Sequence, residues 1–165
     1  MSNDVKQKLI IISGSPCVGK SVVSENLLYT FENSAYLDDD SVWLVNPFSF
    51  NDPRNQIGYK NMSFVLSNYL NSNFDYVIFS SVRMISNRDS VLMDITARNY
   101  TTIGFTLKCS EETLVERHKK RGDNNKVSFE WLRLEPYPND YVINTDNKTV
   151  TQIVNEIKNI IIEHS

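Results

Sequence analysis

The sequence predicts an α/β fold built on a parallel sheet with helices on both faces. Segments typical of strands and of helices alternate along the whole chain, and this alternation favours right-handed crossovers between parallel strands. Two expected strands, Leu9–Ser13 and Tyr76–Phe79, are continuous apolar runs, as strands buried on both faces usually are. A length of 165 residues fits one domain over residues 1–165.

Each expected element has its own signal. Helix 55–70 is indicated by apolar residues at helical spacing. Ser86 and Asp89 resemble a capping box, which predicts a helix from 86 to about 98. Ser110 is expected to cap a helix that Gly122 ends. The expected strands are 9–13, 35–37, 76–79, 101–107 and 141–143, and the expected helices are 20–32, 55–70, 86–98, 110–121 and a last helix over 150–161.

The composition excludes several classes of protein. There are 17 lysines and arginines against 20 aspartates and glutamates, a net charge of −3, so we expect neither nucleic acid nor an anionic membrane surface as a partner. No apolar run approaches the roughly 20 residues of a membrane span. The two cysteines, Cys17 and Cys109, form no metal or disulfide motif. We therefore expect a cytoplasmic protein with free thiols, as a monomer or a weak homodimer.

One motif decides the class of protein. Directly after the first expected strand comes GSPCVGKS, a complete GxxxxGKS loop. Glycines allow such a loop to turn successive N–H groups toward phosphate oxygens, and the following helix adds the positive end of its dipole. Lys20 is expected to reach the outer phosphates, and the Ser21 hydroxyl to bind Mg²⁺. The nucleotide-binding residues expected here are Gly14, Ser15, Pro16, Cys17, Val18, Gly19, Lys20, Ser21 and Val22.

Two large classes of P-loop protein fit the sequence less well. GTPases normally read guanine with Asn-Lys-x-Asp, and the nearest string, NKTV at 147–150, lacks the aspartate. Motor ATPases normally have an acidic residue at the end of the third strand, which here ends in FSS at 79–81. Small kinases are the class that remains.

The chain resembles the P-loop kinases of the shikimate, gluconate and adenylate kinase type over nearly its whole length. The loop GSPCVGKS is common among them, and LDDD at 37–40 is similar to the D-x-D motif of the shikimate kinase branch. The helix 110–121 resembles the one that leads into their lid, with Arg-x-x-x-Arg at Arg117 and Arg121, and NTD at 144–146 resembles their adenine-side loop. LDDDSVWLVNPF is also similar to the LDGDxxWxxxPF pattern of small bacterial proteins described only as ATPases or nucleotide kinases.

This resemblance implies five parallel strands in the order 2-3-1-4-5, a short lid over about 118–135, and ATP and Mg²⁺ as cofactors. The D-x-D motif implies that Asp38 supports Mg²⁺ together with Ser21, and that Asp40 acts as a catalytic residue on the acceptor hydroxyl, alongside Lys20. Both acids would contact the substrate, whereas Asp39 is expected to point away. Three adjacent carboxylates repel one another unless a cation or a hydroxyl is present; a solvated acidic turn is the alternative.

The resemblance also implies roles for three arginines and a threonine. Arg117, as a catalytic residue, and Arg121 would stack near the base or clamp the transferred phosphoryl group, with Thr145 beside the nucleotide. Arg133, after the lid, would add a second clamp on the substrate. The alternative for these arginines is a basic helix end that complements the helix dipole.

The acceptor side is expected around two aromatic residues and one arginine. Trp43 and Phe48 would line the acceptor pocket, although a hydrophobic plug is an equal interpretation. Arg83 follows the third strand at the place where shikimate-type kinases hold acceptor groups, and a surface salt bridge is its alternative.

The function that the sequence favours is transfer of the γ-phosphate of ATP, with Mg²⁺, to a hydroxyl-bearing metabolite or a nucleoside-type compound. A nucleoside monophosphate kinase would need several arginines around the acceptor phosphate, and residues 38–83 contain only Arg54 and Arg83. A regulatory module that binds a nucleotide without turnover is the other alternative, because the acid at the end of the third strand is missing.

Overall fold

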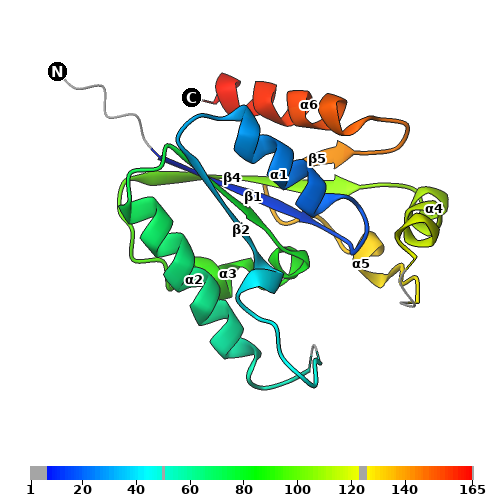
Figure 1. The fold of residues 1–165 in the computed structure, drawn as a ribbon, viewed down its shortest axis with the longest axis horizontal. Helices are drawn as coiled ribbons and strands as arrows, with labels where there is room; N and C mark the ends of the chain where they lie inside the picture. The colour runs from blue at the N-terminus through cyan, green and yellow to red at the C-terminus, as the bar shows by residue number, and fades with distance from the viewer. Residues whose placement is uncertain (1–6, 50, 123–125, 165) are drawn as a thin grey trace.

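Parallel strands form one sheet in the computed structural model (Figure 1). The structure describes residues 7–49, 51–122 and 126–164, but not the side chains of residues 83 and 84. The strands are β1 (Gln7–Gly14), β2 (Ser34–Asp38), β3 (Tyr76–Ser80), β4 (Tyr100–Lys108) and β5 (Tyr141–Asn144). Their order is β2-β3-β1-β4-β5, and every neighbouring pair is parallel. The α/β class and the strand order predicted from the sequence are therefore confirmed.

Helices cover both faces of this sheet (Figure 1). On one face lie α1 (Lys20–Thr30) and α6 (Val150–Glu163), and on the other lie α2 (Asn55–Asn71) and α3 (Arg88–Leu92). The helices α4 (Glu111–Arg121) and α5 (Glu130–Arg133) follow β4, and short 3-10 turns, η1 (Asp39–Ser41) and η2 (Val82–Ile85), follow β2 and β3. Among the described residues, no helix is both long and apolar enough to cross a membrane.

The two faces of β1 divide the core into two clusters. Ile10 and Ile12 pack in the cluster of α1 and α6, and Leu9 and Ile11 pack in the cluster of α2, because side chains alternate along a strand. All four residues are fully buried, as the apolar run predicts. A sheet buried on both faces leaves the loops beyond the carboxyl ends of its strands as the place for a site.

One helix is shorter than expected. α3 begins without a hydrogen bond from a capping side chain, so the capping box expected from Ser86 and Asp89 is wrong. The helix ends at Leu92 instead of near residue 98. The hydroxyl of Ser67 accepts a hydrogen bond from the backbone N–H of Thr96 at 3.0 Å, so this N–H is used outside a helix.

The ends of α4 agree with the sequence analysis. The side chain of Ser110 accepts a hydrogen bond from the backbone N–H of Thr113 at 3.1 Å. Gly122 ends the helix in the left-handed conformation, with φ of 69°. Both ends therefore fix the helix that carries Arg117 and Arg121.

Candidate active site

The GxxxxGKS loop turns sharply between β1 and α1. At Gly14 φ is 149°, and a Cβ atom there would lie 2.8 Å from both Leu107 O and Val18 Cγ1. Gly19 has φ of 109° and immediately precedes α1, while Cys17 also has a positive φ, of 63°. The loop therefore curls in front of the N-terminus of α1, where backbone N–H groups and the helix dipole favour an anion.

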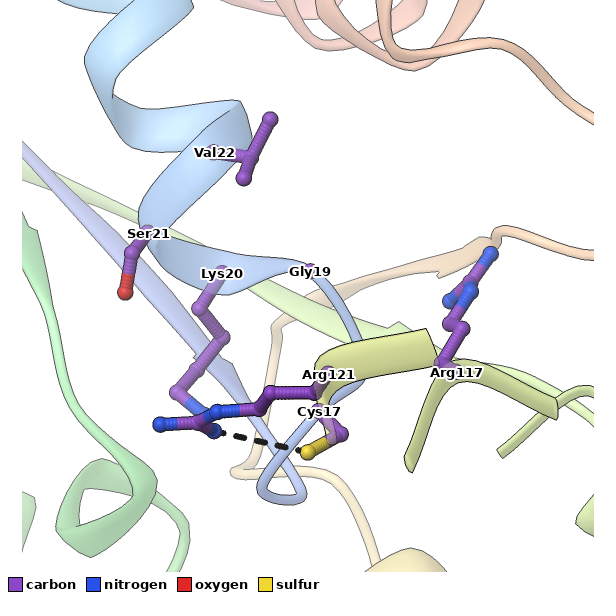
Figure 2. A pocket seen from close by; sticks show the side chains of 7 residues that line it. All are labelled: Cys17, Gly19, Lys20, Ser21, Val22, Arg117 and Arg121. Atoms are coloured by element: carbon purple, nitrogen blue, oxygen red, sulfur yellow. Dashed lines mark hydrogen bonds between the residues drawn. The ribbon is translucent and has the colours of Figure 1, made fainter. Parts of the chain in front are cut away.

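A cavity of about 280 Å³ lies between this loop and α4. Figure 2 shows the side chain of Arg121 extended toward Lys20 and Cys17, with Arg117 turned the other way. The residues that line the cavity are Cys17, Gly19, Lys20, Ser21, Val22, Arg117 and Arg121. All of them are among the nucleotide-side residues expected from the sequence.

The side chain of Lys20 turns back over the loop. Its Nζ donates a hydrogen bond to Ser15 O at 3.0 Å. Removal of solvent lowers the pKa of Lys20, and the negative charges of Asp39, Asp38 and Asp40 only partly oppose that shift. A desolvated cation gains most from a nearby negative charge, which suits Lys20 to a phosphate group.

The two arginines of α4 tie this helix to the loop. Arg117 Nη1 donates to Val18 O at 2.7 Å and to Thr145 Oγ1 at 2.9 Å, and its Nη2 donates to Thr145 O at 3.0 Å. Thr145 is fully buried directly after β5. Arg121 Nη1 donates to Cys17 Sγ at 3.4 Å. The structure thus brings Arg117, Arg121 and Thr145 to the same loop.

Asp38, the last residue of β2, meets Ser21 at the start of α1. Its Oδ2 atom accepts hydrogen bonds from the hydroxyls of Tyr36, Ser80 and Ser21 at 2.8, 2.9 and 2.9 Å. Its Oδ1 atom accepts one from the backbone N–H of Asp40 at 3.1 Å. Burial pushes the pKa of Asp38 up, but these hydrogen bonds together hold it below its usual range. The expected partners Ser21 and Asp38 are therefore in direct contact.

The neighbouring acids differ from what the sequence suggests. Asp39 is buried, 8% exposed, and its Oδ2 accepts a hydrogen bond from Ser81 Oγ at 2.6 Å. Its charge raises the pKa of Lys20 more than that of Asp38 or Asp40 does. The expectation that Asp39 points away from the site is therefore wrong, because the turn η1 directs it inward while Asp40 is exposed.

The donor set at this corner fits Mg²⁺. One carboxylate oxygen from each of Asp38, Asp39 and Asp40 lies within 4.8 Å of the others, and the Ser21 hydroxyl is bonded to Asp38. Hydroxyl and carboxylate oxygens are the hard ligands that Mg²⁺ prefers. Ser21 and Asp38 are the pair that could hold the ion.

Three other expected site residues, Trp43, Phe48 and Arg133, are not among the residues that line the cavity. Trp43 packs beside the core cluster under α2, and its Nε1 donates to Asn55 Oδ1 at 3.1 Å. Phe48 is 49% exposed. Arg133 forms an ion pair with Glu111 at 2.7 Å. The side chain of Arg83 lies outside the described residues.

Sequence reasoning did not single out Tyr36 and Ser80. Tyr36 lies two residues before Asp38 on β2, so both side chains point to the same face of the strand. Ser80 is opposite Asp38 in the register of β2 and β3. The alternation along β2 was a signal for Tyr36, but the contact of Ser80 depends on strand pairing.

The fold and the loop together define the class of protein. A parallel sheet in the order β2-β3-β1-β4-β5, with GxxxxGKS between β1 and α1, is the fold of P-loop kinases. The chain belongs to the AAA domain family, whose model matches residues 10–138. The resemblance to P-loop kinases seen in the sequence is thereby confirmed.

Solved structures share this fold. The tunicamycin resistance protein of Deinococcus radiodurans has 18% identity over 94% of this chain and 96% of that chain, with a TM-score of 0.73. A gluconokinase from Sinorhizobium meliloti 1021 has 16% identity over 98% and 99%, with a TM-score of 0.62. The APS kinase of Mycobacterium tuberculosis, solved with AMPPNP and APS, has 11% identity over 94% and 98%, with a TM-score of 0.67. Among curated proteins no sequence matches.

Proposed function

We propose that the protein transfers the γ-phosphate of ATP to a hydroxyl group of a small-molecule acceptor, with Mg²⁺ as the second cofactor. The observation that carries this proposal is the convergence of Lys20, Ser21 and Arg121 on one cavity, with Asp38 bonded to Ser21 at its border. Phosphoryl transfer depends on positioning and charge neutralisation more than on covalent chemistry. These residues supply two cations and hard oxygen ligands around a single space.

The loop 14–21 would hold the phosphates of ATP. Lys20 Nζ, now bonded to Ser15 O, would exchange that carbonyl for an oxygen of the outer phosphates. Arg121 would stabilise the transferred group, and Arg117 with Thr145 would border the base, because their mutual hydrogen bonds already join α4 to the loop after β5.

Asp40 would act on the acceptor. Mg²⁺ held by Ser21 and Asp38 would offset the negative charge of the phosphates. The exposed carboxylate of Asp40 would take the proton of the acceptor hydroxyl, whose oxygen forms a bond to the γ-phosphorus while the bond to the departing ADP breaks. Trp43, Phe48, Arg83 and Arg133 are proposed for the acceptor side, and residues 118–135 for the lid.

The names of the similar structures support a small-molecule acceptor. Gluconokinase and APS kinase are both kinases of small molecules. The tunicamycin resistance protein has the same fold and, by its name, acts in antibiotic resistance. Antibiotics therefore belong among the compounds to be tested.

The experiment is a screen of metabolites, nucleosides, nucleoside monophosphates and antibiotics for ATP consumption, with mass spectrometry of the products. A product that carries one added phosphoryl group is expected from one class of acceptor. Lys20→Ala and Asp40→Asn should abolish its formation, whereas Asp94→Asn, a change at an exposed acid after α3, should not.

Two outcomes would contradict the proposal. Phosphorylation of nucleoside monophosphates alone would make the protein a nucleoside monophosphate kinase. ATP binding without a phosphorylated product from any class would make it a regulatory nucleotide-binding module.

A further inference from the structure

The Oδ2 atom of Asp38 accepts hydrogen bonds from three hydroxyls. Tyr36, Ser80 and Ser21 lie 2.8, 2.9 and 2.9 Å from this one atom. A carboxylate has about four lone-pair directions over its two oxygens, so three donors are more than one oxygen accommodates well. The proposed metal would bind Ser21 through a lone pair of its Oγ atom, and Tyr36 and Ser80 are the two donors to Oδ2 that come from the sheet.

Tyr36 and Ser80 are held by the sheet itself. Tyr36 lies on β2 in the same strand as Asp38, and Ser80 is the residue of β3 that pairs with Asp38. Ser80 is 1% exposed, and the ring of Tyr36 packs against the core cluster of α1 and α6. Neither hydroxyl therefore depends on a loop for its position.

The two hydroxyls also contact each other at 2.8 Å. Each hydroxyl has a single hydrogen, so two hydrogens serve three contacts: Tyr36 with Asp38, Ser80 with Asp38, and Tyr36 with Ser80. In every arrangement of these hydrogens at least one points at Asp38. Tyr36 and Ser80 therefore hold the carboxylate as a connected pair.

These contacts bear on the acid that is missing at the end of β3. Ser80 stands at that end, and the carboxylate bonded to it comes from the neighbouring strand. We propose that Tyr36 and Ser80 are positioning residues that hold the Asp38 carboxylate against Ser21. This inference rests on the proposed function, because it concerns the metal of that same site.

The test measures metal coupling rather than turnover. The affinity of the full chain for AMPPNP is measured by calorimetry twice, once with excess Mn²⁺ and once with EDTA, and the ratio of the two Kd values reports how much the metal adds. The wild type is expected to bind AMPPNP more tightly with Mn²⁺. In Tyr36→Phe and Ser80→Ala this advantage should fall about three- to tenfold, as expected for the net loss of one ordinary hydrogen bond, while the affinity in EDTA stays unchanged.

Matched variants separate positioning from folding. Tyr36→Phe keeps the ring that packs in the core, and Ser80→Thr keeps the hydroxyl and should keep the full Mn²⁺ advantage. Tyr100→Phe removes a hydroxyl at the start of β4, the opposite end of the sheet, and should leave both affinities unchanged. If Ser80→Ala does not fold, Tyr36→Phe still carries the test.

The two possible failures are distinct. A wild type that gains nothing from Mn²⁺ would overturn the metal site of the proposed function. A wild type that gains from Mn²⁺, with Tyr36→Phe and Ser80→Ala gaining as much, would overturn the positioning role alone.

Discussion

Arg88 and Asp140 form an ion pair in the interior of the protein. Arg88 Nη1 and Nη2 donate to Asp140 Oδ1 and Oδ2 at 2.6 and 2.7 Å, and the two side chains are 3% and 1% exposed. Arg88 Nη2 also donates to Ser13 Oγ at 3.1 Å, and Thr106 Oγ1 donates to Asp140 Oδ2 at 2.7 Å. The pair therefore ties α3 and the segment before β5 to the carboxyl ends of β1 and β4.

Removal of one partner of this pair should destabilise the protein strongly. Arg88→Met leaves Asp140 as a buried charge without its partner, and the free energy of unfolding should fall by about 3–5 kcal/mol. Urea denaturation measures the change. Arg98→Met, at an exposed arginine, should change it by less than about 0.5 kcal/mol. A similar small loss in Arg88→Met would mean that the ion pair contributes little.

The fold could be predicted from the sequence because each element has a local signal. The apolar run of β1 and the capping residue Ser110 of α4 act within a few neighbouring residues. Strand order is not local, and here it came from the resemblance to P-loop kinases. The early end of α3 has no such local signal, and beyond it the backbone N–H of Thr96 bonds to Ser67, 29 residues away in the chain.

The residues of the candidate site also fall into those that a local motif identifies and those whose contacts join distant parts of the chain. GxxxxGKS and D-x-D are contiguous segments, so Lys20 and Asp38 could be identified from sequence. The burial of Asp39 depends on Ser81, 42 positions further along the chain. Arg88 and Asp140 are 52 positions apart and are indistinguishable in sequence from surface charges. Contacts of this kind are created by strand pairing and packing.

Lys20→Ala should weaken ATP binding. The change removes a charge-assisted contact to phosphate, and calorimetry should show a loss of about 1.5–3 kcal/mol in binding free energy. Lys60→Ala, at an exposed lysine of α2, is the matched control and should bind ATP as the wild type does. Equal affinities of Lys20→Ala and the wild type for ATP would contradict the proposal that this loop binds the nucleotide.

Asp146 should make stability depend on acid pH. Burial raises its pKa, but the bonds from Ser110 N–H, from the side chains of Thr113 and Ser110, and the charge of Arg117 together hold the pKa below its usual 3.8. Folding therefore favours the ionised form. The stabilisation is present above pH 3.8 and is lost as pH falls through the lower pKa of the folded state.

The measurement compares the wild type with Asp146→Asn. The difference in unfolding free energy should be constant near neutral pH and should shrink as the pH falls below 3.8. A difference that does not change with pH would show that the charge of Asp146 contributes nothing to stability.

A nucleotide should protect Cys17 from alkylation. Cys17 lines the cavity, so a bound nucleotide covers its thiol, and iodoacetamide should react about tenfold more slowly at an ATP concentration ten times the Kd. Cys109 lies outside the cavity, and burial raises its pKa, so its slow reaction should not respond to ATP. Peptide mass spectrometry follows both thiols in one sample, and equal protection of the two would indicate a global change instead of a local site.

The two tryptophans should report two different events. Trp131 belongs to α5, and this segment is anchored where Lys108 Nζ donates to Leu132 O at 2.6 Å. Trp43 follows the acidic turn and is bonded to Asn55. Closure of a lid over ATP excludes water from the site, so AMPPNP should change the fluorescence of Trp131, measured in Trp43→Phe.

The acceptor, in contrast, should act mainly on Trp43, measured in Trp131→Phe, because Trp43 lies beside the acids proposed to bind it. This pair of variants gives a substrate screen that needs no turnover, and AMPPNP serves as the control ligand in both. If saturating AMPPNP leaves the emission and the quencher accessibility of Trp131 unchanged, residues 118–135 do not close over the nucleotide. The proposed contact of Arg133 with the substrate would then lose its main support, because Arg133 pairs with Glu111 at 2.7 Å.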